Sequence, residues 1–212
     1  MQSPFAPQPQ KASCLPLAGQ TSPESSDSVA DGVLVCALTA NDSAAFDRLF
    51  ARYSPQLLSY LSRLVAGKCD PEDLLQETFL RVLTHAANFK AGMPVRPWLY
   101  TIARNIALNA LRHHKMRAEL EVSVDRSDWH PPSGLQQAGE PSGEMERQEQ
   151  REKVLVALEQ LPPLHREAIV LMLFEQFTYQ EAASITGESE GTLRSRMFYA
   201  LRKLRDRLKE HA

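Results

Sequence analysis

Several features that often reveal a protein's class are missing from this chain of 212 residues. Only three cysteines occur, Cys14, Cys36 and Cys69, and they form no CxxC pair. This pattern argues against a zinc knuckle or a disulfide framework and favours a reducing compartment. No run of about 18 apolar residues is available to insert into a membrane. The N-terminal residues also lack the basic and apolar segments of a secretory signal, so we expect a soluble intracellular protein.

Motifs for catalysis and for cofactor binding are equally scarce. The sequence contains no Gly-rich phosphate loop, no HExxH and no GxSxG motif. His113 and His114 are neighbours, but no third ligand follows at the spacing of a metal site. We therefore predict no catalytic residue, no metal and no cofactor, and we do not expect an enzyme.

The alternation of apolar and polar residues that marks β-strands is also absent, whereas apolar residues recur at helical spacing. We predict an all-α chain with two small helical domains, over residues 30–114 and 151–212. A flexible linker over residues 115–150, in which acids outnumber bases, joins them. It is either a solvated spacer or a segment that lies in a basic channel of a partner. Residues 1–29 are rich in Pro, Gln and Ser and are predicted to form a disordered tail.

The first domain is expected to begin with a short amphipathic helix followed by a longer one. Asn41-Asp42-Ser43 interrupts the apolar pattern between them and can cap the second helix, which Gly67 ends. Pro55 lies inside this second run and marks either a helix boundary or a kink.

A third helix is predicted to start after Asp70, with Pro71 at its first position. One of its faces is apolar and is expected to meet the core: Leu75, Phe79, Val82 and Leu83. The opposite face is acidic and comprises Asp70, Asp73 and Glu77, with Gln76 beside them. Such a face suits a basic or amide-rich protein surface, although a merely solvated face has the same pattern.

The fourth helix, predicted from Trp98 to Arg112, contains no acidic residue and is a candidate for binding single-stranded nucleic acid. Aromatic rings stack on bases, and a cationic groove holds the backbone of such a strand. The residues that offer rings, charge or amides are Arg96, Trp98, Tyr100, Arg104, Asn105, Asn109 and Arg112. The preceding loop, Phe89 to Pro97, contains Gly and Pro residues that suit an open backbone able to hold an extruded base. Trp98 can instead belong to the core beside Ile102 and Ile106.

The second domain is predicted to end in a helix-turn-helix. Thr178 and Glu181 can form a capping box for a short helix, and Ser189 can cap the last helix. The last helix is expected from Glu190 to about Leu208, with a buried stripe of Leu193, Met197, Ala200, Leu201, Leu204 and Leu208. A DNA-binding helix-turn-helix places the N-terminal half of such a helix in the major groove, where arginines can bond guanine edges. The alternative is a solvated basic helix in a generic bundle.

Two stretches of the first domain, DPEDLLQETFL from Asp70 and RPWLYTIARN from Arg96, resemble the second conserved region of bacterial sigma factors. Three stretches of the second domain resemble the fourth region: LPPLHREA from Leu161, TYQEAA from Thr178 and EGTLRSR from Glu190. With two such domains and no middle domain, the chain is similar to the small extracytoplasmic-function, or group IV, sigma factors.

The resemblance implies three binding surfaces. Core RNA polymerase would meet Asp70, Asp73, Leu74, Gln76, Glu77 and Phe79. The promoter −10 element, with an unstacked base of its non-template strand, would meet Phe89, Arg96, Trp98, Tyr100, Arg104, Asn105, Asn109 and Arg112. The −35 element would meet Gly191, Thr192, Arg194, Ser195, Arg196, Phe198, Tyr199 and Arg202.

The resemblance also implies partners and a place of action. The acidic helix would bind the clamp helices of the large β′ subunit, and the flap of the β subunit would be a second contact. Promoter DNA and an anti-sigma factor would be the other partners, in the bacterial cytoplasm. Two other functions stay open at this point: a stand-alone helix-turn-helix regulator, and a helical adaptor without a nucleic-acid role. We favour the sigma factor, because a stand-alone regulator has no need of a polymerase-binding motif.

Overall fold

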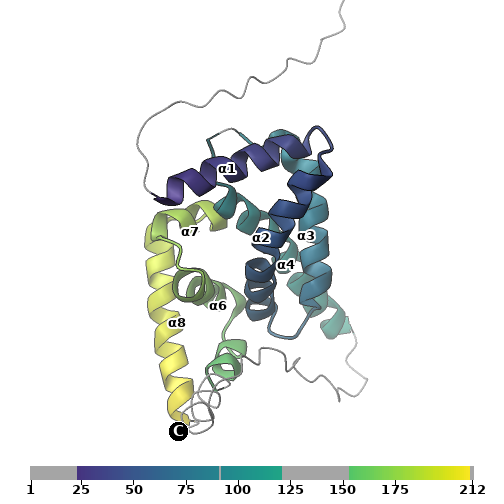
Figure 1. Cartoon of the computed structure of the whole chain (residues 1–212). Helices are drawn as coiled ribbons and strands as arrows, with labels where there is room; N and C mark the ends of the chain where they lie inside the picture. Colours follow the sequence, from purple (N-terminus) through teal and green to yellow (C-terminus); the bar gives the residue numbers. More distant parts are fainter. Residues whose placement is uncertain (1–22, 91, 121–152, 211–212) are drawn as a thin grey trace, which may run out of the picture.

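A computed structural model describes residues 23–90, 92–120 and 153–210, and every regular element in these residues is a helix (Figure 1). The N-terminal half contains α1 (Pro23–Leu38), α2 (Ser43–Val65), α3 (Pro71–His85), the 3-10 turn η1 (Ala86–Asn88) and α4 (Val95–Leu120). The C-terminal half contains α6 (Pro163–Ile169), the π-helical η2 (Val170–Phe174), α7 (Tyr179–Thr186) and α8 (Glu190–Glu210). Residues 153–159 are also helical. The prediction of an all-α chain is confirmed.

Two helices of the N-terminal half, α2 and α3, begin where the sequence places a capping carboxylate. Asp42 accepts a hydrogen bond from the backbone N–H of Ala44 at 2.9 Å, at the start of α2. Asp70 accepts one from the N–H of Glu72 at 2.8 Å, and Pro71 occupies the first turn of α3. Each cap satisfies a donor that the helix itself leaves unpaired, so both predicted starts are confirmed.

Side-chain caps also fix the ends of the two helices of the helix-turn-helix. Thr178 and Glu181 form the predicted capping box of α7, with the Thr178 N–H donating to the Glu181 carboxylate at 2.8 Å. Gly187 ends α7 with φ at +71°, a left-handed conformation that favours glycine. Ser189 then accepts from the N–H of Thr192 at 3.1 Å, in the first turn of α8.

Three helices extend further than the sequence pattern indicates. Helix α1 begins at Pro23, within the predicted tail, and α2 continues through Pro55 without a boundary. Helix α4 begins at Val95 and continues through residues 115–120, which belong to the predicted linker but are good helix formers. The remaining parts of the predicted tail and linker lie outside the described residues. Of the helices in the described ranges, none combines the length and apolar character that crossing a bilayer requires.

One apolar core spans both halves of the chain. Tyr60 and Leu61 of α2 and Leu99 and Tyr100 of α4 have no exposed surface. The same cluster continues into the C-terminal half through Val170, Leu171, Phe177, Ala182, Ile185 and Leu193. Helix α4 contacts α7, and α2 contacts both α6 and η2. In Figure 1, α6 accordingly lies between α8 and the N-terminal helices.

A smaller cluster fastens α8 to the rest of the C-terminal half: Leu158, Leu161, Ile169, Met197 and Ala200. The predicted buried stripe of α8 is therefore only partly correct. Leu201 is 43% exposed, because it lies one residue, or about 100°, away from the buried Ala200. Leu204 and Leu208 are half-buried.

Arg166 of α6 is the largest fully buried side chain among the described residues, and it ties the halves together. Its guanidinium donates to the carbonyl of Leu64 on α2 at 2.8 Å. It also donates to the carbonyls of Leu158, Glu159 and Leu161, at 2.8–3.0 Å. Burial lowers the pKa of Arg166, so these bonds offset a real desolvation cost.

Replacing Arg166 with Met should lower the free energy of unfolding by about 3 kcal/mol or more, because four carbonyls lose their shared donor. Urea unfolding followed by circular dichroism measures the change. Arg205→Met is the matched control, because the Arg205 side chain is 65% exposed. Equal stabilities of the two variants would contradict the structural role of Arg166.

Candidate protein and nucleic-acid interfaces

The acidic face predicted on α3 is present and accessible. Asp70, Asp73 and Gln76 are exposed. Glu77 is half-exposed and pairs with Arg81 one turn later, at 2.8 Å. An exposed pair of this kind contributes little to stability, so the face remains available to a partner.

Leu74 and Phe79, which the resemblance assigns to polymerase contact, are instead buried, with 8% and 2% of their surface exposed. They pack α3 against the core. They support polymerase binding only indirectly, by fixing the position of the helix that presents the acidic face. The reverse holds for Leu83, which is predicted to face the core and is 44% exposed. The other three residues of the predicted core face, Leu75, Phe79 and Val82, are buried, and Leu80 is 59% exposed.

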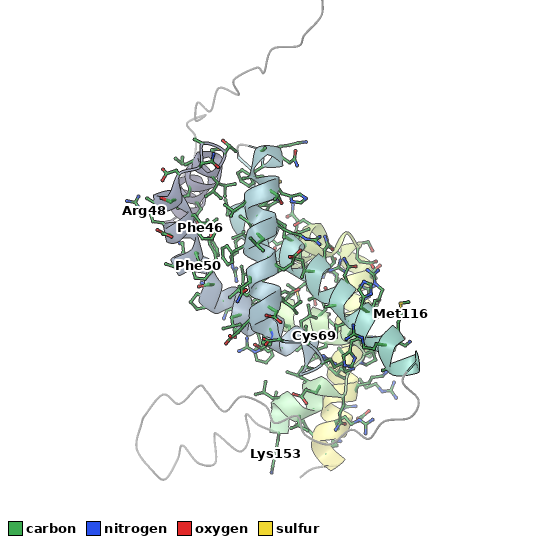
Figure 2. The ribbon with its side chains drawn as sticks, turned by 90° about the vertical axis from the view of Figure 1, so that its right-hand side faces the viewer. Phe46, Arg48, Phe50, Cys69, Met116 and Lys153 are labelled. Atoms are coloured by element: carbon green, nitrogen blue, oxygen red, sulfur yellow. The ribbon has the colours of Figure 1, made fainter. Side chains whose placement is uncertain are left out.

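An aromatic cluster joins α2 to α3. Figure 2 shows Phe46 and Phe50 close together, and their ring centroids are 5.9 Å apart. The Phe50 ring also lies 4.8 Å from that of Phe79 on α3, yet 40% of Phe50 is exposed. The sequence alone does not indicate this exposure, because the spacing of Phe50 from Phe46 fits the helical period of a core face. Exposed apolar groups beside carboxylates are typical of a surface that binds another protein.

The loop before α4 is built around a contact between two rings. Phe89 is buried, and its ring centroid lies 5.1 Å from that of the half-buried Trp98. Of the two roles that the sequence leaves open for Trp98, packing and base stacking, the structure thus shows packing. Gly92 has φ at +88° and allows the tight reversal between η1 and α4.

The C-terminal half covers the side of α4 that carries Arg96 and Tyr100. Tyr100 is fully buried, and its hydroxyl donates to the Glu175 carboxylate at 2.5 Å. Arg96 donates to the Glu175 carbonyl at 2.6 Å and lies over the ring of Phe177, 4.1 Å from its centroid. Burial raises the pKa of Tyr100, and its hydrogen bond to Glu175 raises it further, so the phenol stays protonated and donates.

Arg104, one turn further along α4, is also bonded to a carboxylate of the C-terminal half. Its guanidinium donates to both carboxylate oxygens of Glu167, at 2.6 Å and 3.3 Å. Only 12% of the Arg104 side chain and 1% of that of Glu167 is exposed. Burial raises the pKa of Glu167, against the opposing effect of Arg104. Desolvation therefore outweighs the attraction of the ion pair at this carboxylate.

The other predicted −10 residues of α4 remain at least partly accessible. Asn105 and Arg112 are exposed, and Asn109 is half-buried. The Asn105 side-chain oxygen accepts a long hydrogen bond from Arg104, at 3.5 Å. The structure therefore divides the predicted set into a covered pair, Tyr100 and Arg104, a partly covered Arg96, whose side chain is 37% exposed, and an open group that includes Asn105.

Helix α8 presents the predicted −35 residues on one side. Six of them are exposed: Gly191, Arg194, Ser195, Phe198, Tyr199 and Arg202. Arg194 lies over the ring of Tyr179 on α7, 4.5 Å from its centroid, and pairs with Glu190 at 3.1 Å. Thr192 is half-buried and bonded to Ser189. This arrangement holds a cationic side chain near the start of α8, where a helix-turn-helix meets the major groove.

Arg196 is less accessible than Arg194. Its guanidinium donates to Glu188 at 2.7 Å, and only 17% of its side chain is exposed. Burial lowers the pKa of nearby His165, and the charges of Lys203 and Arg196 lower it further. Lys203 and Arg196 therefore both lie near His165, and Glu188 is the counter-ion of Arg196.

Three surfaces emerge from this geometry: acidic and apolar on α3, basic and amide-bearing on α4, and cationic with aromatic side chains on α8. Such groups bind macromolecules through charge, stacking and hydrogen bonds. Within the part of the chain that the structure describes, no group of three or more His, Cys, Asp or Glu side chains is placed to hold a metal ion.

Comparison with protein families matches both halves of the chain. Sigma-70 region 2 matches residues 49–117, which include all of α3 and most of α4. Sigma-70 region 4 matches residues 151–204, which include α6, α7 and most of α8.

Several known proteins resemble the chain over most of its length. The RNA polymerase sigma factor CarQ of Myxococcus xanthus is 38% identical over 167 residues, which cover 78% of this chain and 90% of CarQ. The ECF RNA polymerase sigma-E factor of Escherichia coli (strain K12) is 31% identical over 177 residues, 82% of this chain and 92% of that protein.

Two solved structures have the same fold. The sigma factor RpoE of Bartonella quintana, in complex with the anti-sigma factor NepR, has a TM-score of 0.60 and 26% identity, over 77% of this chain and 96% of that chain. CnrH in complex with the cytosolic domain of CnrY has a TM-score of 0.61 at 24% identity, over 86% of this chain and 99% of that chain. Taken with the two family matches and the relatives above, these likenesses show that the chain belongs to the extracytoplasmic-function group of the sigma-70 family, whose members direct the initiation of transcription.

Proposed function

We propose that this chain recruits core RNA polymerase through α3, opens the −10 element with α4 and recognises the −35 element with α8, in the bacterial cytoplasm. The observation that carries the proposal is the separation of charge: an exposed acidic face and two basic surfaces occupy different helices of one chain. The match of each half to a different sigma-70 region supports the same division.

The polymerase contact is assigned to Asp70, Asp73, Gln76 and Glu77. Their carboxylates and amide suit a basic or amide-rich protein surface, which we identify with the clamp helices of the β′ subunit. Phe50 and Leu80 add exposed apolar area beside them. The C-terminal half would make the second contact, with the flap of the β subunit.

The −10 contact is assigned to α4 and the loop before it. Melting then results from differential binding, because the protein stabilises the separated strand more than the duplex. Unstacking a base costs a few kcal/mol, which contacts to an extruded base and to the phosphates offset. Asn105, Asn109 and Arg112 are accessible for this purpose in the structure, whereas Tyr100 and Arg104 require the C-terminal half to move.

The −35 contact is assigned to the exposed side of α8. Arg194 and Ser195 lie in its N-terminal half, which enters the major groove in helix-turn-helix proteins. Arg202 and the aromatic pair Phe198 and Tyr199 lie further along and would meet the backbone.

A stand-alone DNA-binding regulator is not favoured, because the relatives that match most of the chain are named RNA polymerase sigma factors. An anti-sigma factor is a further proposed partner. The support is the solved complex of RpoE from Bartonella quintana with the anti-sigma factor NepR, whose sigma factor resembles this chain.

Run-off transcription tests the proposed function. Core bacterial polymerase is mixed with a library of genomic fragments, with and without this protein. Transcripts that start only in its presence are expected, and aligning the DNA upstream of them gives the −10 and −35 sequences. Retention of duplex fragments by the protein alone, without new transcripts, would identify a stand-alone regulator instead.

Replacing Arg194 with Ala should weaken promoter use by about 1–3 kcal/mol, because an arginine that bonds a base edge is lost. Transcription is compared on a promoter with its −35 element intact and on one with that element scrambled. The variant should lose activity only on the intact promoter, and Arg205→Ala, on the same helix, should lose none. An equal loss on both promoters would remove Arg194 from the −35 surface.

Replacing Asn105 with Ala should spare polymerase binding but reduce open-complex formation, because Asn105 is exposed on the proposed −10 surface. Permanganate reactivity of −10 thymines reports strand opening. Gln56→Ala is the matched control, since Gln56 is an exposed amide on α2. Wild-type reactivity in the Asn105 variant would show that this side chain does not contact the open strand.

A further inference from the structure

An acidic side chain lies in the buried stripe of α1. Asp31 is 2% exposed, and it shares one face of the helix with the buried Val35 and Leu38. Its carboxylate accepts a hydrogen bond from the Tyr53 hydroxyl of α2 at 2.5 Å and one from the Arg52 guanidinium at 2.6 Å. Burial raises the pKa of Tyr53, and the bond to Asp31 raises it further, so the phenol stays protonated and donates.

A buried carboxylate is an unusual means of fastening one helix to another. It loses hydration that its partners only offset, so an apolar residue in the same place would often pack α1 on α2 as stably. What Asp31 adds is direction. Hydrogen bonds between particular atoms fix the rotation and the axial position of α1, whereas apolar contacts alone tolerate several. The neighbours of Asp31 on α1 are therefore held in one place.

Gly32, the residue after Asp31, lies against the loop between η1 and α4. A Cβ at Gly32 would lie 3.8 Å from Cε1 of Phe89, in ordinary van der Waals contact with the ring. Alanine therefore fits at this position, but a longer side chain would displace the ring. Helix α1 also contacts η1 and α4, the elements on either side of the loop (Figure 1).

Phe89 links α1 to the start of α4. Its ring centroid lies 5.1 Å from that of Trp98, and its N–H donates to the Ala86 carbonyl of η1 at 3.1 Å. A shift of α1 at Gly32 would therefore move the Phe89 ring, and with it the packing of Trp98. These are the loop and the helix to which the −10 contact is assigned.

We propose that Asp31 and Gly32 are positioning residues for strand opening. Asp31 fixes α1 on α2, and Gly32 holds the Phe89 ring, so that the loop is already arranged to receive an extruded base. Such an arrangement lowers the cost of ordering the loop when the strand binds. Both residues act through Phe89 rather than by touching DNA. This inference rests on the proposed function, because it takes the loop as part of the −10 surface.

The first test varies the size of residue 32. Gly32→Ala and Gly32→Leu both favour a helix over glycine, so lower helix propensity cannot explain a defect in either variant. Only the leucine is too long for the space beside Phe89. Val33→Leu is the matched control, because Val33 is the next residue of α1 and is 63% exposed.

Three readouts separate the loop from the rest of the molecule. Fluorescence emission of Trp98 reports its packing, in a Trp129→Phe background that leaves Trp98 as the one tryptophan of the chain and is used for fluorescence alone. Migration with core polymerase on a native gel reports polymerase binding. Permanganate reactivity of −10 thymines, on a promoter found by run-off transcription, reports strand opening.

Gly32→Leu should move Trp98 emission to longer wavelength and lower permanganate reactivity about tenfold, because fewer molecules hold the loop in the competent arrangement. Its polymerase binding should match that of the wild type. Gly32→Ala and Val33→Leu should match the wild type in all three readouts.

Asp31→Leu tests the directional bonds. The leucine keeps an apolar contact with α2 but offers no acceptor to Tyr53 or Arg52, so this variant should behave like Gly32→Leu. Asp31→Asn keeps an oxygen that can accept the Tyr53 hydroxyl, and it should recover most of the strand opening. Should Asp31→Leu fail to fold, Gly32→Leu carries the test.

Four results with the variants would overturn the positioning role. They are wild-type opening in Gly32→Leu, reduced opening with unchanged Trp98 emission, an equal loss of opening in Val33→Leu, and loss of polymerase binding together with opening. The last would show that α1 supports the whole N-terminal half rather than the loop. All four leave the sigma function intact. Absence of run-off transcripts with the wild-type protein would instead overturn the proposed function, and with it the assignment of the loop to the −10 surface.

Discussion

Two buried glutamates that meet three arginines determine how this molecule is arranged. Glu167 and Glu175 come from the C-terminal half, and Arg63, Arg96 and Arg104 come from α2 and α4. Their pairing accompanies the packing of Phe177 on Tyr100 and of η2 on α2, so that one apolar core extends through both halves. This pairing determines which parts of α4 are accessible.

Local backbone geometry places Glu175 and Phe177 beside α4. The π-helical η2 widens the helix after α6, and the Glu175 N–H donates to the Val170 carbonyl at 3.0 Å. Gln176 then adopts a left-handed conformation, with φ at +56°, and reverses the chain. Glu175 and Phe177 consequently reach α4 from either side of this reversal, while Arg166 anchors the preceding helix to α2.

Much of the fold could be predicted from the sequence, because caps and helical spacing are local. The starts of α2, α3 and α7 follow from Asp42, Asp70 and Thr178, each of which bonds a nearby N–H. The exposure of Asp73 on α3 follows from the same periodicity. Periodicity does not distinguish adjacent apolar residues, and for this reason the prediction that Leu83 faces the core is wrong.

The ion pairs between the two halves could not be predicted in this way. Arg104 and Glu167 are 63 residues apart, and no pattern within one helix indicates which distant carboxylate a guanidinium will meet. The basic character of α4 indicates only an anionic partner. In the structure the anionic partner of Arg104 is Glu167 of the same chain.

The most direct test is the distance between the halves, measured in the free protein and in its complex with core polymerase. Spin labels on non-natural side chains at Asp47 of α2 and Asp206 of α8, both exposed, leave the native cysteines unchanged. We expect one narrow distance distribution in the free chain and a shift to longer distances on the polymerase. An unchanged distribution in the complex would contradict the proposed −10 role of Tyr100 and Arg104, because both side chains would then remain packed against the C-terminal half when the promoter is opened.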